Sequence, residues 1–383
     1  MKASDVLSAL TDVRDSFVLE SALPPAGKDL PPVTTSGRGR ERDRSLGRLF
    51  TGGWLVAAVC ALVSAATLWC LIYLGQNPPI PPVGTEGVTV KPPESGEEPV
   101  TEDKAFPSLV FVSRGDGTCS VKASKDFGSR AEDSHLVIPA VSPDGDQVTA
   151  VEDYGFLWKK SLCSVTLPES LETIGQWAFA ECGSLETVLL SEGVTSIGTA
   201  AFLECTALSE VRLPEGLTHL GDSAFSSCTS LKRVTVPGSL GMIPQWAFYH
   251  CAALEELTLA EGVTSIGYSA FYGCGSLTSL TLPATLHTLS KGAFAQCGGL
   301  MSVSVGEGLT TLESLAFDKC VSLVSVTLPA SLEILSGDAF RDCGSLRTVV
   351  YTGAREGWRA LTENADPLPA GCNVHCADGV VKH

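Results

Sequence analysis

Eight cysteines recur at a strict interval of 23 residues along the C-terminal half of the chain. They are Cys182, Cys205, Cys228, Cys251, Cys274, Cys297, Cys320 and Cys343. Each has an Ala-Phe pair ahead of it, with the Phe three residues before the Cys, and a Leu three residues after it. One such unit cannot bury its own apolar face, so the units must stack on one another. The chain is therefore expected to fold as a solenoid.

Each repeat divides into three segments. Leu-x-x-Val-x-Leu alternates apolar and polar residues, which predicts a β-strand with one buried face. Prolines such as Pro214 and Pro237 end several of these strands, because proline cannot continue the ladder. Leu-x-x-Ile-Gly predicts a turn with inward apolar residues, and x-x-Ala-Phe-x-x-Cys predicts a short helical turn. The predicted fold is an α/β leucine-rich-repeat solenoid, with a parallel β-sheet and short helical turns, preceded by one transmembrane helix.

This combined pattern resembles the BspA-like leucine-rich repeats of bacterial surface proteins. The resemblance covers about residues 145–350, and an earlier copy of the repeat surrounds Phe156, with Lys159 in place of the Cys. Residues 117–121 and 136–139 resemble the hairpin and first coil that cap such arrays. Residues 350–358 and 374–375 resemble the closing segment. The resemblance implies placement outside the cell, a role in adhesion or in contact with host or matrix, and no catalytic residues.

The membrane segment is a second strong local signal. Residues 54–74 contain no charged side chain, and as a helix they would measure roughly 31 Å, about the thickness of a bilayer core. Arginines from Arg38 to Arg48 precede this segment, and the next basic residue after it is Lys91. The positive-inside rule therefore places the N-terminus in the cytoplasm and the repeats outside. A cleaved signal peptide is the competing interpretation, but the apolar run is too long and no small-x-small cleavage site follows Leu74.

The remaining segments follow from composition. Residues 4–20 place apolar side chains at helical spacing, which predicts a short amphipathic helix. Residues 76–103 are rich in proline and acidic residues, which predicts an extended linker. The expected organisation is a cytoplasmic tail (1–50), a transmembrane helix (53–75), the linker (76–103), an N-terminal cap (104–144), the repeats (145–350) and a C-terminal cap with tail (351–383).

Charge narrows the class of partner. The chain carries a net charge of −17, and residues 1–50 hold eight Lys or Arg against seven Asp or Glu, so the rest of the chain sums to −18. An acidic outer part disfavours nucleic acid, because phosphate binding depends on Lys and Arg. The expected partners are a protein or glycan outside the cell, the membrane through one helix, and a cytoplasmic protein at residues 4–20.

The cysteine row is not expected to carry chemistry. Metal ligands would need to cluster at short spacing, and no repeat contains a second cysteine. Disulfides between neighbouring coils would join parallel side chains, which gives the wrong dihedral angle. We expect small, buried, reduced thiols. Cys372, His375 and Cys376 leave three alternatives, namely a cap disulfide, free thiols or a zinc site, with zinc the weakest.

Catalysis has little support in the sequence. The six His are scattered, and the Gly residues recur at repeat turns rather than in a phosphate-binding loop. We expect no enzyme, no cofactor and no metal. Residues 114–116 spell the integrin-recognition tripeptide Arg-Gly-Asp, but Asp116-Gly117 also suits a hairpin turn, and we favour the turn.

The outward positions of the predicted strands form the candidate ligand-binding face. These residues are Glu210, Arg212, Arg233, Thr235, Glu256, Thr258, Ser279, Thr281, Ser302, Ser304, Ser325 and Thr327, with Thr166, Thr187 and Thr348 at equivalent positions. The alternative is that Thr simply suits strands. Trp177 and Trp246 share one repeat position and are expected to cover gaps in the core, with an exposed pair of rings as the alternative.

Two functions fit these features. The first is a membrane-anchored extracellular protein that binds protein or glycan ligands at the cell surface. The alternative is a transmembrane sensor or regulator whose cytoplasmic N-terminus binds a signalling partner.

Overall fold

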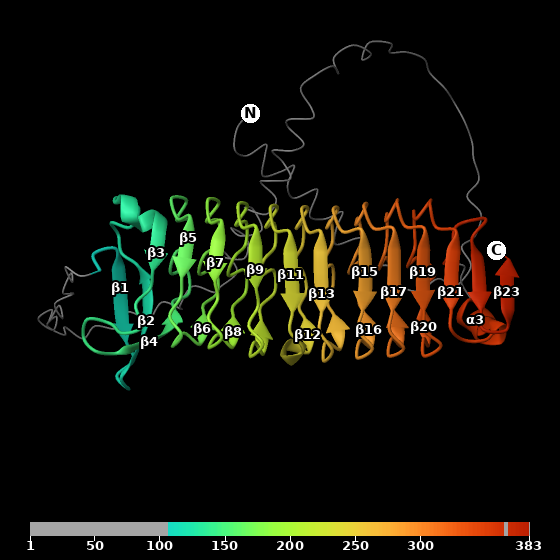
Figure 1. Ribbon diagram of the computed structural model, residues 1–383, viewed down its shortest axis with the longest axis horizontal. Coiled ribbons are helices and arrows are strands. Elements are labelled where there is room, and N and C mark those ends of the chain that lie inside the picture. Colours follow the sequence, from blue (N-terminus) through green and yellow to red (C-terminus); the bar gives the residue numbers. More distant parts are fainter. Residues whose placement is uncertain (1–105, 364–366, 383) are drawn as a thin grey trace, which may run out of the picture. The chain divides into compact units, whose positions relative to one another are not determined.

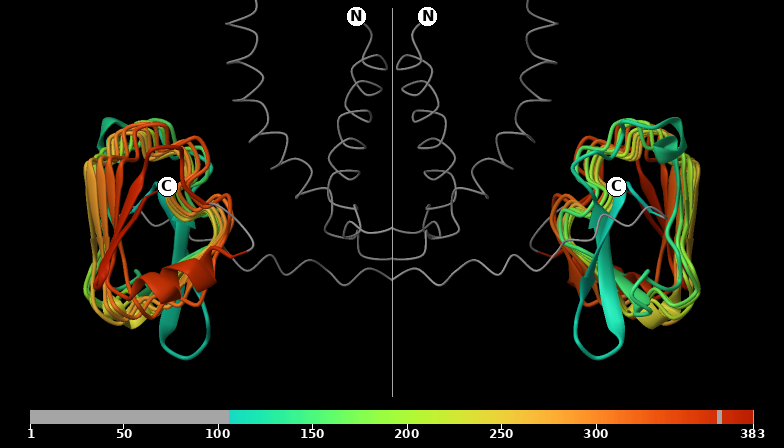
Figure 2. Two further views of the ribbon diagram at one scale, coloured as in Figure 1. Left: turned by 90° about the vertical axis from the view of Figure 1, so that its right-hand side faces the viewer. Right: turned by 90° about the vertical axis from the view of Figure 1, so that its left-hand side faces the viewer.

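The computed structural model describes residues 106–363 and 367–382, which form a parallel β-solenoid (Figure 1). Its coils stack side by side, and they superimpose when viewed along the stack (Figure 2). The predicted cytoplasmic tail with its helix at 4–20, the transmembrane helix at 53–75 and the linker at 76–103 lie outside the described residues. Within those residues, no helix has the length and apolar character needed to cross a membrane.

The predicted strand is present in every repeat. Equivalent residues of neighbouring coils pair in parallel register, as Val211, Val234 and Leu257 do, and this pairing is interrupted between Glu256–Leu259 and Ser279–Leu282. We call the exposed surface of these strands the front face. The strands are β3 (His135–Val137), β5 (Ser164–Thr166), β7 (Thr187–Leu189), β9 (Glu210–Arg212), β11 (Arg233–Val236), β13 (Glu256–Leu259), β15 (Ser279–Leu282), β17 (Ser302–Val305), β19 (Ser325–Leu328) and β21 (Thr348–Tyr351).

The Leu-x-x-Ile-Gly segment differs from the prediction of a simple turn. Its third and fourth residues form a short strand in each coil, because identical repeat lengths bring equivalent N–H and C=O groups into register. These short strands pair in parallel with their neighbours, except between His219–Leu220 and Met242–Ile243. Figure 1 shows these short strands along the lower edge of the solenoid. They are β6 (Thr173–Ile174), β8 (Ser196–Ile197), β10 (His219–Leu220), β12 (Met242–Ile243), β14 (Ser265–Ile266), β16 (Thr288–Leu289), β18 (Thr311–Leu312) and β20 (Ile334–Leu335), joined by β4 (Gln147–Val151).

The prediction of a short helical turn in the x-x-Ala-Phe-x-x-Cys segment is wrong. The segment forms hydrogen-bonded turns rather than helix, and α-helix occurs among the described residues only at α3 (Arg355–Leu361). Positive φ angles, such as +56° at both Trp246 and His250, interrupt the helical backbone. The freed Phe248 N–H donates to the Ala270 carbonyl of the next coil at 2.8 Å, and the same bond recurs along the stack. We call the exposed surface of these turns the turn face.

The core is a continuous row of phenylalanines. From Phe156 to Phe340, neighbouring rings lie 5.1–5.8 Å apart between centroids and are within 9° of parallel. This separation makes the stacking offset, which is the arrangement that aromatic pairs prefer. From Phe179 to Phe340, the Ala before each Phe is fully buried beside it. The predicted inward set of Ala, Phe and Cys is confirmed.

Antiparallel hairpins close the two ends. β1 (Leu109–Ser113) pairs with β2 (Thr118–Ala123), which extends the sheet of short strands through β4. At the other end β22 (Asn373–Cys376) continues the front sheet and pairs with β23 (Gly379–Lys382). These hairpins cap the sheets with antiparallel edge strands.

The Arg-Gly-Asp tripeptide occupies the turn of the N-terminal hairpin, as expected. Asp116 Oδ1 accepts hydrogen bonds from the backbone N–H and the hydroxyl of Thr118, at 3.0 and 2.6 Å. Gly117 has a φ of +84°, which a residue with a side chain rarely adopts. These residues have a structural role in the turn.

Phe248→Ala tests the aromatic row. The ring is fully buried between Phe225 and Phe271, so its removal leaves a cavity and should lower the free energy of unfolding by about 3–5 kcal/mol. The control Thr258→Ala lies on the exposed front face and should change it by less than about 0.5 kcal/mol. Urea denaturation measures both. Equal losses would mean that the inward and outward positions are assigned in the wrong phase.

Candidate ligand-binding face

The front face presents two columns of side chains to solvent. One column contains the first outward residue of each strand, such as Glu210 and Arg233, and the other contains residues two positions later, such as Arg212 and Thr235. The residues between them, such as Val211, are buried. All the predicted face residues are exposed or, at Ser325, Thr327 and Thr348, half-buried. Their outward orientation is confirmed, and their role in binding remains a prediction.

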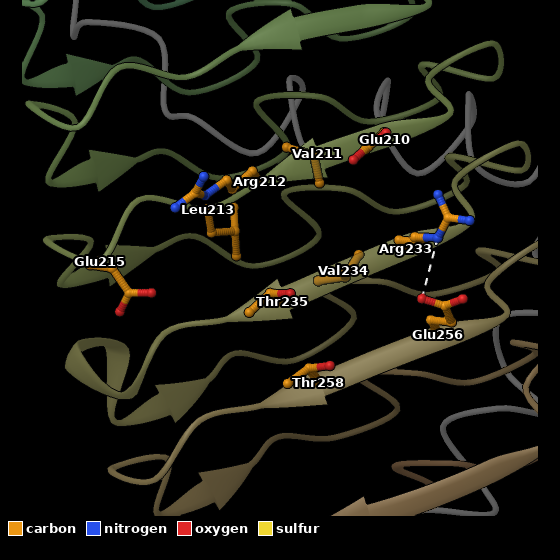
Figure 3. A pocket seen from close by; sticks show the side chains of 10 residues that line it. All are labelled: Glu210, Val211, Arg212, Leu213, Glu215, Arg233, Val234, Thr235, Glu256 and Thr258. Carbon is orange, nitrogen blue, oxygen red and sulfur yellow. Dashed lines mark ion pairs between the residues drawn. The ribbon is translucent and has the colours of Figure 1, made fainter.

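Charge concentrates in the middle of this face. The strand register places Glu210, Arg233 and Glu256 side by side on three neighbouring coils. Arg233 Nε forms an ion pair with Glu256 Oε2 at 3.2 Å, drawn in Figure 3. Both side chains are more than half exposed, so solvent screens the pair and it adds little to stability. The charges are therefore available for recognition.

Glu210 and Arg212 have no ion-pair partner among the described residues. They line a surface pocket of about 350 Å³ together with the buried Val211, Leu213 and Val234 (Figure 3). A carboxylate and a guanidinium on adjacent outward positions can accept from and donate to a ligand at the same time. We call Glu210, Arg212, Arg233 and Glu256 the charged patch.

The face changes character on either side of the charged patch. From Thr258 to Thr327 its outward residues all carry hydroxyl groups. On the N-terminal side Leu189 and Val137 are 65% and 64% exposed at outward positions. The sequence pattern did not single out these two apolar residues, although Leu189 stands where the strands usually carry a polar residue. The front face therefore runs from partly apolar, through charged, to hydroxyl-lined.

The cysteine row is buried, as predicted, and it makes a contact that the sequence did not indicate. Each Sγ from Cys182 to Cys343 lies 3.0–3.5 Å from the carbonyl oxygen of the Phe in the preceding coil. Each thiol can thus donate a weak hydrogen bond between coils. Burial raises the pKa of Cys182, Cys251 and Cys297 to about 12.

The C-terminal Cys-x-x-His-Cys residues do not converge. His375 and Cys376 are successive residues of β22, so their side chains point to opposite sides of the strand. Cys372 is buried ahead of that strand. In residues 106–363 and 367–382, no three His, Cys, Asp or Glu side chains gather as metal ligands.

One serine–histidine contact was not expected from the spacing of the His residues. His135 Nδ1 lies 2.9 Å from Ser164 Oγ, on neighbouring strands β3 and β5. The contact lies on the open front face rather than in a cavity that would exclude water. Among the described residues no ion pair joins His135 to a carboxylate. The geometry lacks the third group that would orient a catalytic base.

Comparison with known proteins agrees with this architecture. The family profile described as "BspA type Leucine rich repeat region (6 copies)" matches residues 141–255 and 241–355. Similar solved structures include a leucine-rich cell surface protein from Faecalibacterium prausnitzii, 21% identical over 69% of this chain and 97% of that one, with a TM-score of 0.40.

A leucine-rich repeat protein of T. pallidum is 27% identical over 56% of this chain and 88% of that one, with a TM-score of 0.40. A leucine-rich repeat protein of Bacteroides capillosus is 30% identical over 33% of this chain and 92% of that one, with a TM-score of 0.30. No curated protein matches the chain.

The buried thiols predict a stability that falls in alkali. The pKa of Cys251 and Cys297 is raised from 9.0 in the unfolded chain to about 12 in the fold. The contribution of the two thiols to the free energy of unfolding is therefore fully present below pH 9.0. It is lost as pH rises towards about 12, at up to about 1.4 kcal/mol per pH unit for each thiol.

Urea denaturation across this pH window measures the slope. The double variant with Cys251→Ala and Cys297→Ala should be less stable at neutral pH but should lose stability less steeply in alkali. The same slope in both proteins would contradict the assignment, because other titrating groups are common to the two.

Proposed function

Because the chain belongs to the family of BspA-type leucine-rich-repeat proteins, we propose that it is a membrane-anchored protein whose repeats bind a protein or glycan ligand outside the cell. The observation that carries the proposal is the charged patch on the front face. There, Glu210 and Arg212 point outward without ion-pair partners among the described residues and line a pocket. Adhesion or recognition at the cell surface is the role that such a site serves.

The front face is suited to binding because its side chains are not needed for packing. The inward residues of the strands fill the core, and the outward residues of β9 and β11 stand on a backbone that parallel pairing fixes on both sides. A ligand that spans several coils meets a preformed surface and pays little ordering entropy there. The hydroxyl-lined strip from Thr258 to Thr327 supplies further donors and acceptors.

Anchoring is proposed from the sequence. The uncharged residues 54–74 are long enough to cross a bilayer, and the arginines before them favour a cytoplasmic N-terminus. In this arrangement the proline-rich residues 76–103 hold the solenoid away from the membrane surface. The fold and family are those of repeat proteins without enzymatic activity, and we infer that this chain is not an enzyme.

A binding array tests the ligand site. The full chain is probed against purified extracellular proteins and glycans, beside the double variant Glu210→Ser with Arg212→Ser. The variant should lose the ligand while keeping its unfolding midpoint, because both side chains are exposed. The control replaces Lys319 and Glu333 by Ser, an exposed pair of the same charges outside the front face. A ligand that is retained by the first variant is bound elsewhere.

Protease shaving of intact cells tests the topology. A protease added outside should release a solenoid fragment and leave a tag at residue 1 intact, since residues 76–103 are expected to be accessible. Cleavage of the tag with protection of the solenoid would reverse the orientation.

A further inference from the structure

Aromatic side chains gather on the turn face of two neighbouring coils. Tyr249 stacks on Tyr272 with ring centroids 5.0 Å apart, and His250 lies edge-on to both at 4.4 and 5.4 Å. Trp246 meets Tyr268 edge-on at 5.6 Å. Backbone hydrogen bonds join the two coils that carry these groups, because the Trp246 N–H donates to the Tyr268 carbonyl at 3.0 Å and the His250 N–H donates to the Tyr272 carbonyl at 2.7 Å. We call these five residues the aromatic platform.

The aromatic platform gathers much of the tyrosine of the chain, and its side chains are partly exposed to solvent. Three of the six tyrosines of the chain fall in it. Tyr268 is 42% exposed, His250 is exposed, and the other three side chains are half-buried. Trp177 is buried, as expected for that repeat position, whereas Trp246 at the same position keeps part of its ring in solvent. The core therefore does not account for these rings.

The backbone is shaped to hold the rings in place. At Gly273 a Cβ atom would lie 2.7 Å from His250 Nδ1, so only glycine leaves room for the imidazole against this coil. Gly273 also has a φ of +74°, which favours glycine. The His250 ring consequently lies beside Tyr272 without a competing side chain.

Small residues border the platform along the stack. Ser226 and Ala295 occupy the repeat position of Tyr249 and Tyr272 in the preceding and following coils, and both are buried. One coil further, Asp318 pairs with Arg341 at 2.7 Å and influences the pKa of Tyr272. The rings are thus followed, across the small Ala295, by a pair of charged hydrogen-bonding groups.

We propose that the aromatic platform is a binding site for a short, neutral oligosaccharide of hexose rings. A hexose has C–H groups on its faces and hydroxyl groups around its rim. The platform matches this with aromatic rings for the C–H groups, and with its phenol groups and the exposed Lys291 beside Tyr268 for the hydroxyls. It lies on the turn face, apart from the charged patch of the front face, so it is a second site.

The size and charge of the platform favour a sugar over a protein. A stable protein interface buries roughly 800 Å² on each partner around an apolar core. Here the flanking positions are small, as at Ser226 and Ala295, or charged, as at Lys291. A compact ligand therefore fits a patch of five rings better than a protein partner does. The net charge of −17 disfavours acidic sugars.

Three of the rings are uncharged at neutral pH, which suits a neutral ligand. Burial lowers the pKa of His250, and burial raises the pKa of Tyr249 and Tyr272. The imidazole of His250 and the phenols of Tyr249 and Tyr272 are therefore in their neutral forms.

Biolayer interferometry with immobilised hexaoses of glucose, mannose and galactose tests the site. The full chain is used in a detergent without a sugar headgroup. At least one hexaose should bind, and Tyr268→Ala should weaken that binding about tenfold, the loss of one ring contact. Tyr268→Phe should retain most of that binding, because the ring remains and only one hydroxyl contact is lost. Tyr154→Ala is the matched control, since Tyr154 is 38% exposed and lies in a distant coil.

Three outcomes would overturn the proposal. The first is no binding of any hexaose at millimolar concentration. The second is equal loss in the variants of Tyr268 and Tyr154. The third is a protein, rather than a sugar, captured through Tyr268. Arg212→Ser separates the two sites. A sugar that no longer binds this variant but still binds Tyr268→Ala belongs to the front face. A sugar that still binds Arg212→Ser but no longer binds Tyr268→Ala supports the platform, whatever the front face binds.

Discussion

Backbone hydrogen bonds hold each coil to the next, and the rest of the structure depends on them. The long strands and the short strands pair in parallel, with one break in the long strands between β13 and β15 and one in the short strands between β10 and β12. The Phe N–H of the turn donates to the Ala carbonyl of the following coil across both breaks. One inserted residue would move the Phe and Cys of its coil out of their rows. The strict interval of 23 residues is the consequence of these ladders.

The stacking of the coils also determines at which positions of the repeat the side chains can differ. Inward positions are filled by rows of Phe, Cys, Leu and Val that are buried from end to end. Outward positions carry no such requirement. The charged patch on the front face and the aromatic platform on the turn face use this freedom, and both lie on the central coils of the array. A regular scaffold can therefore present two chemically different surfaces without a change in its core.

The features that depend on periodicity could be predicted from the sequence. Alternation located the front strands and separated Val211 from Glu210 and Arg212, and the 23-residue interval placed Phe and Cys inside. The sequence could not predict the turn conformation, because the positive φ angles fall on residues such as Trp246 and His250, which carry no glycine signal. The contact of Cys251 Sγ with the Phe225 carbonyl depends on an offset of 26 residues between coils. The aromatic platform arises in the same way, from residues of two coils that only the stacking brings together.

Native-state amide hydrogen exchange of the full chain tests most directly whether the turns hold the coils together. The informative amides are those of Phe202, Phe225, Phe248 and Phe271, which donate from one coil to the next. The account predicts that they are protected to the same degree as the front-sheet strands, because all belong to one cooperative stack. Exchange of these amides at the rate of an unfolded chain, with the strands still protected, would contradict it.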